Sequence, residues 1–207
     1  MKKFALLLLM CALAMASASA TPIVYNTGVD SSGNLLAVGT ADPNYIVVSG
    51  PVTGSAYVLD PTLYPMGSGP YVANTASSQW ISPLGNATAP VGTYVYQTTF
   101  TSGAGVLSGA VASDNPVTIY LDGTLVFSGP ADTTDYNTLT AFSFNVSSGF
   151  NTLDFDVLNE SCDGCNNPTG LQVAMADVTP VPEPSALMLL GTGLVGLCGV
   201  VRRRFGR

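Results

Sequence analysis

In four stretches of the chain, bulky apolar side chains recur at every second position. The stretches are 94–100, 117–121, 142–146 and 153–157. Successive side chains of an extended chain point to opposite faces, so a period of two predicts β-strands with one buried face and one exposed face. Asp122-Gly123 joins the second stretch to a further apolar run, and this dipeptide is typical of a two-residue β-hairpin.

Residues 23–79 are richer in turn-forming residues, and short strands are predicted near Tyr45–Ser49 and Ser55–Leu59. No composition break separates this region from the rest, so it is predicted to belong to the same domain. No stretch outside the chain ends has the helical period of 3.6 residues. The pattern therefore predicts an all-β fold, a single antiparallel β-sandwich of the jelly-roll type over residues 21–178.

Residues 1–20 have the three parts of a secretory signal peptide. Lys2 and Lys3 form the positive segment, Phe4–Ala16 the apolar segment, and Ala18-Ser19-Ala20 a cleavage site of small residues. We expect export by the Sec machinery and cleavage by signal peptidase after Ala20.

The C-terminal segment 179–207 combines a proline motif, an apolar run over 185–201 and a basic end. The motif is Pro182, Glu183 and Pro184, and the basic end contains Arg202, Arg203, Arg204 and Arg207. As a transmembrane helix the apolar run would span roughly 25 Å, which is short for a hydrocarbon core of ~30 Å. The arginines predict a cytoplasmic tail with the domain outside. A marginal anchor behind an extended, accessible linker at 179–184 suits a sorting signal better than a permanent membrane span.

This segment resembles the PEP-CTERM sorting domain over residues 180–207, with the P-E-P motif, the Gly-rich apolar run and the Arg cluster in the same order. The resemblance implies an exosortase as a partner, a membrane enzyme that acts near the motif. It also implies a Gram-negative bacterium that makes exopolysaccharide. We therefore expect export across the inner membrane, transient anchoring by the C-terminal helix, and delivery to the cell surface or the extracellular matrix.

The distribution of charge narrows the functions open to the domain. Residues 21–201 contain no Lys, Arg or His, and all 13 acidic residues lie between Asp30 and Glu183. Without cations the domain cannot neutralise phosphates, which argues against nucleic-acid binding. Without His it has no imidazole base and no histidine ligand for zinc. Carboxylates are the main groups left for catalysis.

Two cysteines, Cys162 and Cys165, flank Asp163-Gly164 in a polar loop. In an exported chain such a pair is expected to oxidise to a disulfide. A β-turn brings the flanking Cα atoms to within about 7 Å, near the upper limit for a disulfide. A thioredoxin-type redox site is disfavoured, because that site needs a helix N-terminus to lower the thiol pKa.

Asp154 and Asp156 occupy alternate positions of one predicted strand, about 7 Å apart on the same face. This separation is compatible with a glycosidase acid/base pair, so a secreted glycan-directed hydrolase is the alternative function. The same spacing is expected of any solvated strand face. No basic residue is present to tune either carboxyl group, so we expect no enzyme.

Oxygen-bearing side chains on loops favour calcium among metal ions. The candidate ligands for a structural Ca²⁺ are Asp114, Asn115, Asp122, Asn159, Glu160 and Asp163. They do not have the spacing of an EF-hand, and no other cofactor is expected.

Four aromatic residues in or near turns are candidates for stacking on a sugar ring: Trp80, Tyr64, Tyr71 and Tyr136. For Trp80 a place in the core is favoured over sugar stacking, whereas the tyrosines can either stack or place their hydroxyl groups at the surface without binding anything. Their exposure and grouping would separate these alternatives.

The domain also resembles the galactose-binding-like jelly rolls that include many carbohydrate-binding modules. The matching segments include Trp80-Ile81-Ser82-Pro83, the strand Tyr94–Phe100, Ala112-Ser113-Asp114-Asn115 and Pro168-Thr169-Gly170-Leu171. Such motifs mark turns and core positions, so they support the fold more than a ligand. The sequence thus predicts a non-enzymatic envelope or matrix protein whose sandwich contacts exopolysaccharide or other surface components.

Overall fold

The computed structural model describes residues 24–129, 135–162, 167–176, 178–180 and 193. The predicted signal peptide, the P-E-P motif, the Arg cluster and the predicted helix 185–201 (apart from Gly193) lie outside this part of the chain. Within these ranges, no helix has the length and apolar character needed to cross a membrane.

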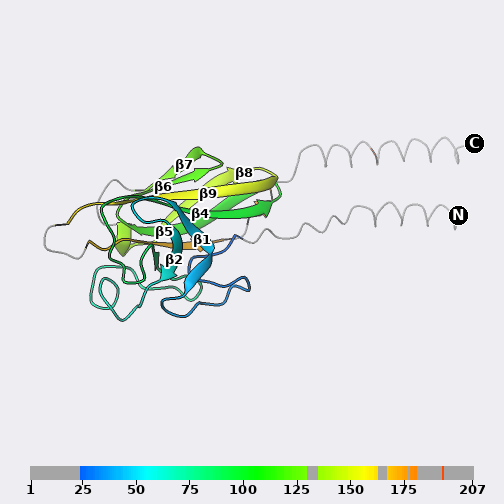
Figure 1. Cartoon of the computed structure of the whole chain (residues 1–207). Coiled ribbons are helices and arrows are strands. Elements are labelled where there is room, and N and C mark those ends of the chain that lie inside the picture. Colours follow the sequence, from blue (N-terminus) through cyan, green and yellow to red (C-terminus); the bar gives the residue numbers. More distant parts are fainter. Residues whose placement is uncertain (1–23, 130–134, 163–166, 177, 181–192, 194–207) are drawn as a thin grey trace, which may run out of the picture.

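The described residues form an all-β domain with eleven strands and one short 3₁₀ helix (Figure 1). Every strand pair is antiparallel. The elements are β1 (Ala41–Ser49), β2 (Gly54–Val58), β3 (Ile81–Ser82), β4 (Gly92–Ser102), β5 (Gly105–Asp114), β6 (Val117–Leu121), β7 (Thr124–Ser128), η1 (Asp135–Asn137), β8 (Thr140–Val146), β9 (Gly149–Asn159), β10 (Gly170–Met175) and β11 (Thr179–Pro180).

Hydrogen bonds connect the strands in the order β8-β5-β10-β3-β2-β1-β4-β9-β6-β7, and β11 pairs with β5. This path of strands curls until its two ends, β7 and β8, are in contact. The ring centroid of Phe127 on β7 lies 5.9 Å from that of Phe142 on β8. The buried side chains of β4, β9 and β6 then share one hydrophobic cluster with those of β5 and β10. The result is the predicted antiparallel β-sandwich.

The alternation seen in the sequence is confirmed along the two longest strands. On β4, the side chains of Tyr94, Tyr96 and Phe100 are buried. On β9, every second residue from Asn151 to Asn159 is buried, while the residues between them are more exposed. Burial of one face of each strand accounts for most of the favourable free energy of such a fold.

Two core strands, β5 and β10, were not predicted from the pattern. The sequence of β5 is rich in Gly, Ser and Ala and lacks alternating bulky residues. A small residue is required at Gly109, since a Cβ there would lie 2.6 Å from Cζ of Phe142 and 2.8 Å from the carbonyl oxygen of Ala174. The predicted domain boundary at 178 and the predicted linker also need correction, because Thr179 and Pro180 pair with β5 as β11.

The N-terminal segment is tied to the rest of the sandwich by buried hydrogen bonds. The Thr27 hydroxyl donates to the carbonyl oxygen of Gln79 at 2.6 Å, and the Val173 N–H donates to the same hydroxyl oxygen at 2.9 Å. These bonds join positions 52 and 146 residues apart. The turn-rich first part of the chain therefore packs into the same body as the later strands.

Candidate functional site

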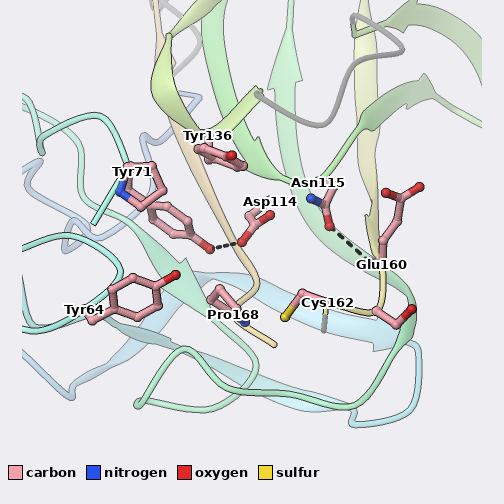
Figure 2. Close-up of a pocket in the computed structure, with 10 residues that line it drawn as sticks. Tyr64, Tyr71, Asp114, Asn115, Tyr136, Glu160, Cys162 and Pro168 are labelled. Atoms are coloured by element: carbon pink, nitrogen blue, oxygen red, sulfur yellow. Dashed lines mark hydrogen bonds between the residues drawn. The ribbon is translucent and has the colours of Figure 1, made fainter. Parts of the chain in front are cut away.

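The loops at one end of the sandwich enclose a pocket of about 380 Å³. It is formed by the loop between β2 and β3, the end of β5, the helix η1, the segment after β9 and the segment before β10 (Figure 2). The lining residues are Tyr64, Pro70, Tyr71, Asp114, Asn115, Tyr136, Glu160, Ser161, Cys162 and Pro168.

The centre of the pocket is a hydrogen bond between two side chains from different loops. The Tyr71 hydroxyl donates to Oδ2 of Asp114 at 2.6 Å. Figure 2 shows Asp114 in the middle, with Tyr64 and Tyr71 on one side and Asn115 and Glu160 on the other. The pocket therefore has an aromatic side and a polar side.

Contacts with two aromatic rings hold Tyr71 in place. Its ring centroid lies 4.2 Å from that of Trp80 and 5.8 Å from that of Tyr136, the latter nearly parallel at 20°. The Trp80 indole N–H donates to the carbonyl oxygen of Val72 at 2.8 Å, and the Val72 N–H donates to the carbonyl oxygen of Tyr136 at 2.7 Å. The loop 59–80 is thus fastened both to the core and to η1.

Burial and a neighbouring charge shape the acidity of the pocket. Burial raises the pKa of Asp114 most strongly, the hydrogen bond from Tyr71 lowers it, and the negative charge of Glu160 raises it, so that the resulting pKa is about 6. Burial raises the pKa of Tyr71 well above its usual value, and the charge of Asp114 adds to this rise. Tyr71 is therefore a neutral donor, and Asp114 changes charge in the range of physiological pH.

The polar side of the pocket is fixed by hydrogen bonds that each involve at least one backbone group. The Glu160 N–H donates to Oδ1 of Asn115 at 3.0 Å, and the Asn115 N–H donates to the carbonyl oxygen of Leu158 at 2.6 Å. The Ser113 hydroxyl donates to the carbonyl oxygen of Asn115 at 2.7 Å. These bonds lock the link between β5 and β6 against the end of β9.

The structure separates the aromatic residues considered from the sequence. Tyr64 is 49% exposed and lines the pocket, as do Tyr71 and Tyr136. Trp80, in contrast, is completely buried, so its proposed role in ligand stacking is corrected to one in the core. From its buried position, Trp80 packs against Tyr71 and so supports the wall of the pocket that Tyr71 forms.

The six candidate calcium ligands do not form one group. Asp114, Asn115 and Glu160 line the pocket, but Asp122 follows the far end of β6, about 23 Å along the strand direction from Asn115. One ion cannot bind both, because Ca²⁺–oxygen distances are about 2.3–2.6 Å. Asn159 is buried, and its amide N–H₂ donates to the carbonyl oxygens of Ala89 and Pro90.

Asp163, the remaining candidate ligand, lies outside the described residues. Among the residues that the structure places, no group of three His, Cys, Asp or Glu side chains is arranged to hold a metal ion. Two carboxylates with Asn115 leave the coordination of calcium incomplete, so a calcium site here stays a prediction that depends on further ligands.

Cys162 lies in the wall of the pocket and is disulfide-bonded. Its predicted partner Cys165 lies outside the described residues, so the pairing itself stays a prediction.

The carboxylate pair on β9 lies away from this pocket. Asp154 and Asp156 are half-buried on the outer face of the strand, and the Gln97 amide donates to Oδ1 of Asp154 at 2.8 Å. Burial, and then the charge of Asp154, raise the pKa of Asp156. A hydrolytic pair needs a concave site around the substrate, and the pocket does not include either residue.

A second hollow, of about 370 Å³, is lined by residues of β1 and β4 and by Ser55 of β2. Its carboxylate, Asp42, accepts backbone N–H bonds from Gly28, Asn44 and Tyr45 at 2.6, 2.8 and 3.2 Å. Tyr45, its aromatic residue, is buried. The Asp42 carboxylate is thus already occupied by backbone donors, and the buried Tyr45 ring is not accessible to a ligand. The pocket beside Asp114 is therefore the stronger candidate.

The chemistry of the pocket restricts its ligand. An exposed tyrosine ring offers a flat surface for the C–H face of a sugar, and carboxylate and amide oxygens accept hydrogen bonds from hydroxyl groups. Because residues 21–201 contain no cationic side chain, an anionic ligand would need a bridging cation. The pocket therefore suits a neutral, hydroxyl-rich ligand best.

Comparison with known proteins identifies the C-terminal segment. A family model described as the PEP-CTERM protein-sorting motif matches residues 180–204. The resemblance of this segment to the PEP-CTERM sorting domain is thereby confirmed. The chain carries the sorting motif of exported proteins that an exosortase processes. No curated protein matches the chain.

Several solved structures resemble the domain weakly. A family 35 carbohydrate-binding module from an environmental isolate is 14% identical, with a TM-score of 0.31 over 55% of this chain and 85% of its own. The GH26-CBM35 β-(1,4)-mannanase of Podospora anserina is 11% identical, with a TM-score of 0.34 over 78% of this chain and 29% of its own. The module CBM36, solved with calcium and xylotriose, is 16% identical, with a TM-score of 0.26 over 76% and 99%. These values are too low to carry an argument about ligand or activity.

Proposed function

We propose that this chain is an exosortase-sorted protein of the cell envelope or extracellular matrix of a Gram-negative bacterium, and that its β-sandwich binds exopolysaccharide without catalysis. The sorting motif at residues 180–204 supports export and anchoring of the tail. The pocket beside Asp114 supports the binding of a glycan.

One observation carries the glycan proposal. The half-exposed ring of Tyr64 lines the same pocket as the oxygens of Asp114, Asn115 and Glu160. A sugar presents an apolar face and a rim of hydroxyl groups, so it needs both kinds of surface within one site. The absence of cations from residues 21–201 favours neutral glycans, and acidic ones would require Ca²⁺.

The test is co-sedimentation of the full-length protein, in detergent, with exopolysaccharide purified from the producing organism. Tyr64→Ala removes the exposed ring, and Leu125→Ala, 53% exposed on β7, is the matched control. We expect saturable binding that Tyr64→Ala weakens about tenfold or more and Leu125→Ala leaves unchanged, as for the loss of a stacking contact. Equal loss in both variants would contradict the site, and no binding by the unaltered protein would contradict the function.

A second candidate function, glycan hydrolysis, is favoured by the environment of Asp114. Burial and Glu160 raise the pKa of this carboxyl group to about 6, as in general acids that work beside an ionised carboxylate. Release of reducing ends from the polysaccharide, abolished by Asp114→Asn, would establish this activity. Binding without release of reducing ends would favour the non-catalytic function.

A further inference from the structure

The pocket and Pro180, where the described part of the domain ends, lie at opposite ends of the sandwich. Phe150 is the second residue of β9, and Asn159, the last residue of this strand, directly precedes Glu160 of the pocket. About 34 Å of extended chain therefore separates Phe150 from Glu160. The same holds for β5, whose last residue is Asp114. Its first residue, Gly105, pairs with Pro180, where the described domain ends.

The end from which the tail leaves carries the most exposed large apolar side chain of the described residues. Phe150 is 69% exposed. Its neighbour Asn151 is buried, and its amide N–H₂ donates to the carbonyl oxygen of Gly149 at 2.9 Å and to the Ser102 hydroxyl oxygen at 3.1 Å. Because Asn151 is fixed toward the interior, Phe150 on the alternating position must project outward.

A short connection limits how far this end can be from the membrane. Four residues, Val181–Pro184, separate Pro180 from the apolar run that begins at Ser185. Fully extended, the chain from Pro180 to Ser185 reaches about 17 Å. A sandwich tethered this closely cannot stand with its pocket end on the membrane and the Pro180 end away from it, since the strands are about 30 Å long and the connection reaches only about 17 Å.

We propose that, while the tail is anchored, the end of the sandwich with Phe150 rests on the bilayer, with the Phe150 ring among the lipid headgroups and the pocket facing away. Aromatic side chains favour this interfacial layer of a membrane. Among the described residues, Asp122 is an acidic residue near this end, and it accepts the Thr152 N–H at 2.8 Å. The orientation follows from the tail and the strand directions, so it does not depend on which ligand the pocket binds.

The test measures contact with lipid at the two ends of the full-length protein in phosphatidylcholine vesicles. Phe150→Trp places a fluorophore at the proposed contact, where the side chain is 69% exposed, and Tyr64→Trp places one at the opposite end, where the side chain is 49% exposed. The unaltered protein gives the background from Trp80, which is buried. With brominated lipid, we expect the emission of Phe150→Trp to fall about twofold and that of Tyr64→Trp to stay unchanged.

Equal quenching at both positions, or none at Phe150→Trp, would overturn the orientation. Extraction of the protein from the vesicles by carbonate would also overturn it, because the tail would then not anchor the domain. If Phe150→Trp does not fold, Ser148→Trp, an exposed position of the same turn, replaces it with the same expected results.

Discussion

The hydroxyl group of Tyr71 donates a 2.6 Å hydrogen bond to Oδ2 of Asp114, across 43 positions of the chain. Tyr71 lies in the long loop between β2 and β3, whereas Asp114 is the last residue of β5. The bond therefore joins two walls of the pocket and places a neutral donor against a buried carboxyl group. Several properties of the protein should depend on this pair.

Removing the donor should weaken the domain most when Asp114 is charged. In Tyr71→Phe the carboxylate loses a hydrogen bond that lowers its pKa, so we expect that pKa to rise above about 6. The loss should cost about 1.5–3 kcal/mol of unfolding free energy at pH 7.5 and less at pH 4. Denaturant unfolding at both pH values measures this, with the exposed Tyr64→Phe as control. An equal loss at both pH values would contradict the role of the charge.

Replacing Asp114 by Asn should change how stability depends on pH. The folded state raises the pKa of Asp114 from 3.8 to about 6, so its contribution to stability is present at low pH and is lost as pH rises through about 6. Asn does not ionise. The stability of Asp114→Asn relative to the unaltered protein should therefore increase by about 3 kcal/mol between pH 3.5 and pH 7.5. Unfolding curves across this range check it, and a constant difference would refute it.

Glycan binding should depend on pH through the same carboxyl group. As an ionised acceptor Asp114 forms stronger hydrogen bonds to hydroxyl groups than the protonated acid does. We expect the affinity for exopolysaccharide to fall severalfold when the pH is lowered from 7.5 to 4.5, and to change less in Asp114→Asn. Titration of the polysaccharide at both pH values measures this. The same pH dependence in the variant would assign it to another group.

Gly109 should not tolerate a larger side chain. The Cβ of Gly109→Ala would lie 2.6 Å from Cζ of Phe142, so β5 and β8 would have to shift. We expect a loss of about 1–3 kcal/mol in unfolding free energy, as for overpacked cores. Gly103→Ala, where no heavy atom lies within 4 Å of the new Cβ, is the control and should change stability little. Similar thermal unfolding of the two variants would show that the sandwich relaxes around the methyl group.

Added cations should stabilise the domain. All acidic residues except Glu183 lie between Asp30 and Asp177, and this region has no basic residue. Their mutual repulsion should weaken with ionic strength, so the melting temperature should rise by a few degrees between low salt and about 150 mM salt. A further rise with millimolar Ca²⁺, reversed by chelator and absent in Asp114→Asn, would locate the ion in the pocket. A melting temperature independent of both would exclude this electrostatic effect.

Part of the fold could be predicted because it depends on neighbours in sequence. The alternation of Tyr94 and Tyr96 with polar residues indicated β4, and Asp122-Gly123 indicated the turn between β6 and β7. β5 was missed because its small residues serve close approach to Phe142 and Ala174, which are distant in the chain. Where close contact with neighbouring strands requires small residues, a strand shows no alternation of bulky apolar and polar side chains.

The sequence alone determined the C-terminal sorting motif, the all-β class and the lack of cations in residues 21–201, because these depend on a local motif, on composition and on a side-chain period of two. The sequence also placed Tyr64, Tyr71, Asp114 and Glu160 among the candidates, but as separate residues. Only the tertiary structure decided that these residues share a pocket, that Trp80 lies beneath it and that Asp122 lies at the other end. The order and register of the strands determine these positions. Both depend on pairing between residues far apart in the chain, which no local sequence pattern encodes.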